Sequence, residues 1–409
     1  MSDLARGLDP WSVVLADEFR ARQNKLRARL AELGLDGAVV WSRGGGAMDM
    51  SADVLYLCNH YPPHPYDGDD AGLGRALSHT ACVIATDGAA TLIADGPYWR
   101  QDLVVADDVR VSKDLPGEAA AAVRDLGLDT TRLAFVGLSY MSASAYLDFA
   151  AALPEATLTF ADNLVKRIRM HKSEAECDLI RISSSLGASA VEAILAGVVE
   201  GQTEAGAVAP AIARLHEHGV GLYDAVSSSG PYSHIFAHAR LPGFDAVRPM
   251  QRGDLFHIDV YGAFGGYLFD LARSRCVGDE PTVEQHSLLE AAISGVDAVV
   301  GAVRAGRSCE ELADVGSDAL RAVEISVGGE RVAAESLVGW GAFGHGLGMS
   351  WEPPFIRAGD TTVLQPRMYL AVELSLYHPA IGGAMYEHNF LVTDTGCEVL
   401  THGARARWW

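Results

Sequence analysis

The feature that most constrains the fold of this chain is an acid-bearing strand pattern over residues 255–276, LFHIDVYGAFGGYLFDLARSRC. Two apolar segments with period-two spacing flank a glycine-containing turn, which predicts an antiparallel hairpin. With the turn centred on Phe264–Gly265, we expect Asp259 and Asp270 to lie directly opposite each other, with Cβ atoms roughly 4.5–5.5 Å apart. Two carboxylates at that separation repel unless one is protonated or a cation lies between them. The pattern favours oxygen ligands for a divalent metal; the alternative is that both acids face solvent.

Three further stretches carry candidate ligands. His345 lies between glycines in GAFGHGLGMSW, where little side-chain bulk competes with the imidazole. Glu373 in MYLAVELSLY and Glu387 in GAMYEHNFLVT are acids within apolar strands, where an unpaired carboxylate is costly. The short loop between these strands makes cross-strand neighbours of the two glutamates. Together with the two aspartates they form an oxygen-rich set that suits two ions such as Mn²⁺, Fe²⁺, Co²⁺ or Zn²⁺.

Composition limits the class of protein. The chain has 409 residues, 49% hydrophobic and 21% charged, which is enough for two domains with cores of their own. A net charge of −21 argues against nucleic-acid binding, which needs a basic surface. We find neither an apolar run of the ~18 residues that a membrane helix needs nor a signal peptide, so we expect a cytoplasmic enzyme without a membrane partner. The six cysteines are far apart and are expected to be reduced.

The order of segments predicts two domains. Strand-like stretches, including ADVLYLCNHY at 52–61, alternate with helical ones over residues 1–165, which predicts an α/β domain. A Ser-x-x-Glu capping box at Ser173–Glu176 then marks the start of a long helix. Further helices are expected at 203–218, 282–304 and 308–323, and the strands that carry the acids fall between and after them. Residues 166–409 therefore form the second domain.

At this point the chain resembles a known family, the M24 or "pita-bread" metallopeptidases, in the branch of prolidase, aminopeptidase P and creatinase. The resemblance rests on the order of Asp259, Asp270, GHGLG, Glu373 and Glu387, and on RIRMHKSEAECDLIR at the domain junction. It implies an α/β N-terminal creatinase-like domain followed by an α+β pita-bread catalytic domain. It also implies two divalent metal ions, with Asp270 and Glu387 bridging them; the implied ligands are Asp259, Asp270, His345, Glu373 and Glu387.

The resemblance also assigns catalytic roles and exposes departures. His238 matches the histidine that contacts the scissile region of the substrate, and Glu373 matches the residue that exchanges protons with the attacking water. Glu352 occupies the position, seven residues after His345, where the peptidases carry a second histidine. Met385 stands where prolidases have an arginine, and the family's Glu-Pro-Gly is Glu-Leu-Ser here. The pocket is therefore expected to differ from that of an ordinary prolidase.

Other residues are candidates for substrate binding. In the creatinase-like branch a loop of the N-terminal domain closes the site of the partner in a homodimer. The matching loop here is CNHYPPHPYDGDD, which makes His60, Tyr61, His64 and Tyr66 candidates. Trp340 and Trp351 flank the candidate metal histidine, and their rings favour a cationic or methylated group. The alternative for all six is ordinary packing or surface.

Three functions remain open from the sequence. The first is hydrolysis of the amide bond before a proline in a dipeptide or short peptide. The second is different chemistry on a small molecule, because similar scaffolds host creatine hydrolysis, ectoine ring hydrolysis and dimethylsulfoniopropionate lysis. The third is a non-catalytic binding protein. The complete ligand set argues against the third and against a metal-free, creatinase-like mechanism.

Overall fold

The computed structural model describes residues 8–45, 48–62, 78–238 and 243–409. The chain divides into two compact units, Trp11–Arg169 and Met170–Trp409, and residues 8–10 belong to the second. The expected boundary at 165/166 falls inside helix α5 (Leu164–Arg169). This helix stays with the N-terminal unit because the buried Arg169 pairs with the buried Asp53, with Nε and Oδ1 3.4 Å apart.

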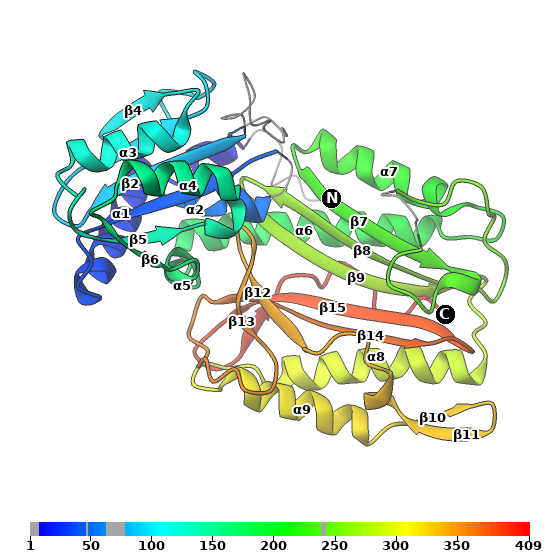
Figure 1. Cartoon of the computed structure of the whole chain (residues 1–409). Coiled ribbons are helices and arrows are strands. Elements are labelled where there is room, and N and C mark those ends of the chain that lie inside the picture. The colour runs from blue at the N-terminus through cyan, green and yellow to red at the C-terminus, as the bar shows by residue number, and fades with distance from the viewer. Residues whose placement is uncertain (1–7, 46–47, 63–77, 239–242) are drawn as a thin grey trace. The chain divides into compact units, whose positions relative to one another are not determined.

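The N-terminal unit is a mixed sheet with helices on it (Figure 1). Its strand order is β4-β3-β2-β1-β5-β6, with β1–β2 and β2–β3 antiparallel and the other pairs parallel. Val39 and Trp41 of β1 pack in one core with α3 and α4, while α2 contacts β1 and β2. The strands are β1 (Gly37–Arg43), β2 (His79–Ala85), β3 (Ala90–Ala94), β4 (Asp108–Val111), β5 (Arg132–Val136) and β6 (Thr157–Phe160). The helices, besides α5, are α1 (Ala16–Glu32), α2 (Met48–Cys58), α3 (Leu115–Asp125) and α4 (Ala143–Ala152).

The stretch ADVLYLCNHY, predicted as a strand, lies mainly in helix α2. The prediction was wrong because residues 51–58 are buried without interruption. A continuous apolar run carries no period, so it does not distinguish a buried strand from a buried helix.

The C-terminal unit repeats one arrangement twice: two helices followed by antiparallel strands. The first half is α6 (Glu174–Gly197), α7 (Glu204–Glu217) and the sheet β7-β8-β9, formed by β7 (Gly221–Ser229), β8 (Leu255–Phe264) and β9 (Tyr267–Cys276). The second half is α8 (Val283–Ala302), α9 (Cys309–Arg321) and the sheet β13-β12-β14-β15-β16. Its strands are β12 (Gly344–Leu347), β13 (Trp351–Phe355), β14 (Tyr369–His378), β15 (Gly382–Val392) and β16 (Cys397–Val399). A separate hairpin of this unit joins β10 (Glu324–Val327) and β11 (Glu330–Ala333). Over both units, short 3₁₀ turns occur at Pro10–Ser12, Leu138–Tyr140, Gly230–Tyr232 and Ala334–Leu337.

The two sheets of this unit meet between two helical layers (Figure 1). Helix α6 packs on β9 and α8 packs on β14 and β15, while β15 contacts β8 and β9 of the other sheet. Every residue of β8, β9 and β15 is consequently buried. Helix α6, which begins at the predicted capping box of Ser173 and Glu176, is the one described helix long and apolar enough to span a membrane. Most of it is buried in this core.

The registers of the two acid-bearing hairpins differ. In β14–β15, Glu373 pairs directly with Glu387, as predicted. In β8–β9, Asp270 pairs with Tyr261 and Asp259 pairs with Ala272, so the two aspartates are diagonal rather than opposite. The turn is centred on Gly265–Gly266, whose φ angles are 59° and 85°. A tight two-residue hairpin turn of this kind requires positive φ at both positions, which two glycines adopt without strain and Phe264 would not.

Candidate metal centre

Five strands bring the predicted ligands together. Asp270, His345 and Glu387 offer ligand atoms that all lie within 4.8 Å of one another, and so do Asp259, Glu373 and Glu387. The period of two places Asp259 and Asp270 on one face of their sheet despite the diagonal register. Glu387 belongs to both groups, which is the arrangement that a carboxylate bridging two cations needs. Asp270, also predicted to bridge, belongs to one group.

Hydrogen bonds hold one oxygen of each of three carboxylates and leave the other free. The Tyr261 hydroxyl donates to Asp259 Oδ2 at 2.7 Å, and the Trp351 indole N–H donates to Asp270 Oδ2 at 2.6 Å. The backbone N–H of Ala272 donates to Glu387 Oε2 at 2.8 Å. The remaining oxygens, Asp259 Oδ1, Asp270 Oδ1 and Glu387 Oε1, are buried without a hydrogen-bond partner. Buried carboxylate oxygens without donors are costly, and divalent ions are the partners that satisfy them.

His345 is oriented for the same task. Its Nδ1 lies 3.0 Å from the carbonyl oxygen of Gly346, so the neutral ring with its proton on Nδ1 donates there. Its Nε2 then presents a lone pair, 3.4 Å from Asp270 Oδ2 and 3.6 Å from Glu373 Oε1. A backbone carbonyl that fixes the tautomer in this way is the usual support of a metal-binding imidazole.

The charges of the cluster call for a cation. Burial, reinforced by the neighbouring Asp270, raises the pKa of Asp259 and of Glu387 well above the ordinary carboxyl value. Burial raises the pKa of Glu373 to about 7. These directions mean that the cluster resists full ionisation by itself. The unpaired oxygens, the oriented imidazole and the clustered carboxylates thus fit two divalent ions.

A cavity of about 430 Å³ opens on the cluster. Asp259, Asp270, His345 and Glu373 lie in its wall, and most of the other lining residues are aromatic. Trp340 and Trp351 are among them, as predicted. The Trp340 ring lies edge-on to the His345 ring with centroids 5.9 Å apart, and the indole N–H of Trp351 donates to Asp270.

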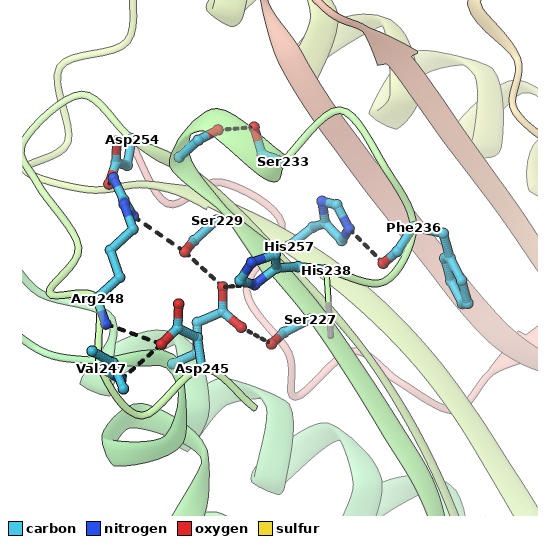
Figure 2. Close-up of polar contacts among 12 residues, drawn as sticks. Ser227, Ser229, Ser233, Phe236, His238, Asp245, Val247, Arg248, Asp254 and His257 are labelled. Atoms are coloured by element: carbon cyan, nitrogen blue, oxygen red, sulfur yellow. Dashed lines mark hydrogen bonds and ion pairs between the residues drawn. The ribbon is translucent and has the colours of Figure 1, made fainter. Parts of the chain in front are cut away.

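His238 is absent from the lining of this cavity, although Phe236, two residues before it in the chain, lines it. Figure 2 shows the contacts around His238. Its ring stacks on Tyr232 with centroids 4.2 Å apart, and its Nδ1 is 4.0 Å from Glu204 Oε1. The buried Glu204 is fixed by the hydroxyls of Ser227 and Ser229, at 2.7 and 2.6 Å. Stacking on Tyr232 therefore holds the His238 ring, and Glu204 lies near its Nδ1 without a hydrogen bond, a neighbourhood that no sequence spacing indicated.

Glu352, predicted as catalytic, is directed away from the cavity. The alternation of β13 places Trp351 and Phe355 in the cavity wall and Glu352 on the opposite face. Its Oε1 lies 2.7 Å from the Nζ of Lys172, and both side chains are buried. In this structure Glu352 is half of a buried ion pair rather than part of the cavity wall, and Trp351 is the residue of this segment that donates to Asp270. The predicted catalytic role of Glu352 stays a prediction.

The candidates of the N-terminal loop are only partly described. His64 and Tyr66 lie outside the described residues. His60 is buried, which lowers its pKa to about 4, and it lines a cavity of about 170 Å³ within the N-terminal unit. Tyr61 lines the same cavity, and its hydroxyl accepts a hydrogen bond from the N–H of Gly45 at 3.2 Å. The predicted contact of these residues with substrate stays a prediction.

Two supporting residues escaped the sequence analysis. Tyr261 lies two positions after Asp259 and so shares its face. Asn389 lies two positions after Glu387; its Oδ1 accepts the N–H of Asp270 at 3.1 Å and its Nδ2 donates to the carbonyl of Asp270. Asn389 thereby joins the two sheets at the site. The signal that could have found both is the period of two counted onward from each acid.

Comparison with known proteins matches both units of the chain to known domains. Residues 178–394 match the metallopeptidase family M24, and residues 22–171 match the creatinase/prolidase N-terminal domain. An Xaa-Pro dipeptidase of Pyrococcus furiosus is 27% identical over 60% of this chain and 66% of its own length. A peptidase of Bacillus subtilis, YqhT, is 25% identical over 93% of this chain and 98% of its own length.

Solved structures show the same two-domain fold. The prolidase of Pyrococcus horikoshii superposes with a TM-score of 0.76 at 20% identity, covering 94% of this chain and 99% of that one. The predicted combination of a creatinase-like α/β domain and a pita-bread catalytic domain is thus confirmed. The match to the family covers more than half of the chain, and the chain belongs to the metallopeptidase family M24.

Proposed function

We propose that this protein is a dinuclear metal-dependent hydrolase that cleaves the amide bond before a proline in short peptides. The observation that carries the proposal is the pair of ligand groups that share Glu387 beneath an accessible cavity. Relatives named as Xaa-Pro dipeptidases support the choice of substrate. The ligands would be Asp259, Asp270, His345, Glu373 and Glu387, and the ions Mn²⁺, Fe²⁺, Co²⁺ or Zn²⁺.

Each residue has a distinct part in this chemistry. Divalent ions at such a site polarise a carbonyl and acidify water. Glu373 lies in the cavity wall, where its carboxylate would accept a proton from water and deliver it to the leaving amine. Tyr261 and Trp351 hold Asp259 and Asp270 in place through their hydrogen bonds. His238, stacked on Tyr232, would contact the substrate near the scissile bond.

The first experiment is metal content per chain together with a peptide panel. We expect about two ions per chain in the wild type, clearly fewer in Asp259→Asn, and hydrolysis of Xaa-Pro dipeptides, their amides and Xaa-Pro tripeptides by protein loaded with Mn²⁺, Co²⁺, Fe²⁺ or Zn²⁺. Matched Xaa-Ala peptides serve as the substrate control. A folded wild type that binds no metal, or that cleaves none of these peptides under any loading, would reject the proposal.

The aromatic cavity keeps a small-molecule amide hydrolase as the second candidate, and turnover of such an amide without turnover of any peptide would select it. We further propose a homodimer in the cytoplasm. All six cysteines are unpaired, which suits a reducing compartment. Sedimentation at micromolar concentration tests the dimer, and fractionation of the source cells tests the location.

A further inference from the structure

The wall of the metal-centre cavity is aromatic to an unusual degree. Six rings line it, and the residues between them are small or belong to the candidate ligand set. The six are Phe236, Tyr261, Trp340, Trp351, Phe355 and Tyr377. Among the residues that the structure describes, neither lysine nor arginine lines this cavity. Apart from the divalent ions that the ligands would hold, the described residues of the wall therefore offer ring faces and edges rather than a side-chain counter-charge for an anion.

The buried and half-buried cations of the same unit already have partners. The Nζ of Lys172 lies 2.7 Å from Oε1 of Glu352. Arg248, drawn in Figure 2, pairs with Asp254 at 2.6 Å. The Arg273 guanidinium donates to backbone carbonyls, including those of Ala272 and Glu387, and lies 4.3 Å above the Tyr386 ring. Moving any of these groups to a substrate would leave an acid or a carbonyl buried without its donor, which is costly.

The aromatic residues nearest the ligands have also committed their polar atoms. Tyr261 and Trp351 direct their O–H and N–H to Asp259 and Asp270, so they offer a substrate only ring carbon. Their rings meet edge-to-face with centroids 5.0 Å apart, and Tyr223 packs edge-on to Trp351 at the same distance. This packing fixes the rings. The uncharged polar side-chain groups that remain in the wall are the hydroxyls of Ser375 and Tyr377 and the indole N–H of the half-exposed Trp340.

We propose that the cavity selects substrates whose leaving-group side carries no negative charge, so that a proline with a neutral or cationic cap is preferred to a proline with a free carboxylate. A free carboxylate would lose its hydration without a lysine or arginine among the described lining residues to compensate its charge. An amide, in contrast, can hydrogen-bond to the hydroxyls, and a cation can bind over the ring faces. This inference rests on the proposed hydrolase function. The reaction itself is unchanged: water adds across the C–N bond, the acyl carbon takes the hydroxyl, and the proton goes to the amine.

The test compares Ala-Pro with Ala-Pro-amide on the metal-loaded enzyme, since the two differ only in the charge of the C-terminal group. We expect kcat/KM for the amide to exceed that for the free dipeptide by at least tenfold. A third substrate, Ala-Pro with an amide-linked trimethylammonium cap, should be cleaved at least as well as the amide. Equal rates, or faster cleavage of Ala-Pro, would overturn the inference while leaving the hydrolase function in place.

A variant can reverse the preference. Trp340 is 40% exposed at the cavity wall, so Trp340→Arg can place a guanidinium there without a buried charge. We expect it to raise kcat/KM for Ala-Pro relative to the amide by about tenfold, the size of one favourable charged hydrogen bond. Trp340→Gln, which removes the ring without adding charge, is the matched control and should not do so. An identical shift in both variants would contradict the charge argument.

The outcome in which neither peptide is hydrolysed is also decisive. Both are then intact ligands, and calorimetric titration into the metal-loaded protein ranks them. Tighter binding of the amide would reject the hydrolase function and retain the cavity preference. Equal or tighter binding of Ala-Pro would reject both. The wild-type comparison needs no variant, so it holds even if Trp340→Arg fails to fold.

Discussion

The two acid-bearing hairpins of the C-terminal unit solve the same problem in different ways. In β14–β15 the two glutamates are paired directly across the strands, whereas in β8–β9 the two aspartates are offset by two residues. Aspartate oxygens are held by aromatic side chains, Tyr261 and Trp351. The oxygen of Glu387 is held by a backbone N–H from the opposite sheet. Both hairpins nevertheless direct their acids to one site.

The difference shows which geometric detail a site of this kind tolerates. An offset of two residues keeps a side chain on the same face of a sheet, whereas an offset of one would turn it to the other face. The two aspartates, whose side chains are shorter, are diagonal neighbours, a position that separates cross-strand residues by roughly 7–8 Å. Trp351 of a third strand donates a hydrogen bond to one of them, Asp270. The glutamates sit face to face, and Glu387 reaches both ligand groups.

The largest effect is expected where the two hairpins share a ligand. Glu387→Gln should remove both ions and reduce kcat/KM at least about a thousandfold, because both ligand groups lose a member. Metal per chain by plasma mass spectrometry and peptide hydrolysis measure the two effects. Glu398→Gln, on the neighbouring strand β16 and paired with Arg181, is the matched control. Retention of two ions in Glu387→Gln would remove the basis for treating the hairpins as one site.

Glu352, which is paired with Lys172 rather than with a metal, should affect the stability of the fold and not the metal content. Lys172→Met leaves Glu352 buried without its partner, which should lower the free energy of unfolding by about 3 kcal/mol or more while metal content stays at the wild-type level. Adding Glu352→Gln should recover most of that loss. Urea denaturation and metal analysis measure both quantities. Loss of metal in Lys172→Met with unchanged stability would mean that Glu352 serves the centre after all.

The pH dependence of the free energy of unfolding of the metal-free protein tests the burial of Glu373 in β14. The pKa of Glu373 is raised by burial to about 7, so the folded state holds a proton that the unfolded chain releases near 4.5. The metal-free protein should therefore be stabilised below about pH 4.5 and should lose up to about 3 kcal/mol as pH rises to about 7. Glu373→Gln should show a smaller loss, because Asp259 and Glu387, whose pKa values burial also raises, still titrate in the variant. We would measure unfolding of both proteins in chelator at intervals across that range; parallel curves would show that Glu373 does not titrate there.

The smallest effect is expected from removing the aromatic hydrogen-bond donors that hold the two aspartates. Tyr261→Phe and Trp351→Phe each remove one hydrogen bond to an aspartate and should weaken metal affinity about tenfold. Trp340→Phe changes another ring of the same wall, one whose recorded contact is the edge-on approach to His345, and is the control. Competition with a chromogenic chelator gives the affinities. Equal affinities in all three variants would show that the aromatic donors are not needed to position the aspartates.

Much of the site was predictable because period-two strands preserve information about faces. Once Asp259, Asp270, Glu373 and Glu387 were assigned to buried strands, the cost of burying acids without partners indicated a shared cation. His345 was found from its glycine neighbours and from the resemblance to the family. The position of Glu352 could not be predicted because counting seven residues from His345 does not reveal a strand face, and β13 turns Glu352 toward Lys172.

By itself, then, the sequence determined the two-domain organisation, the face on which each acid lies and the kind of ion that suits them, because these follow from local periodicity and residue chemistry; the family followed from the resemblance of its motifs to known ones. Only the tertiary structure decided the one-residue shift of the β8–β9 turn, the support from Tyr261, Trp351 and Asn389, and the remaining rings of the cavity wall. These depend on contacts between strands far apart in the chain. Local propensity carries no record of such contacts, because side-chain packing between the two sheets fixes them.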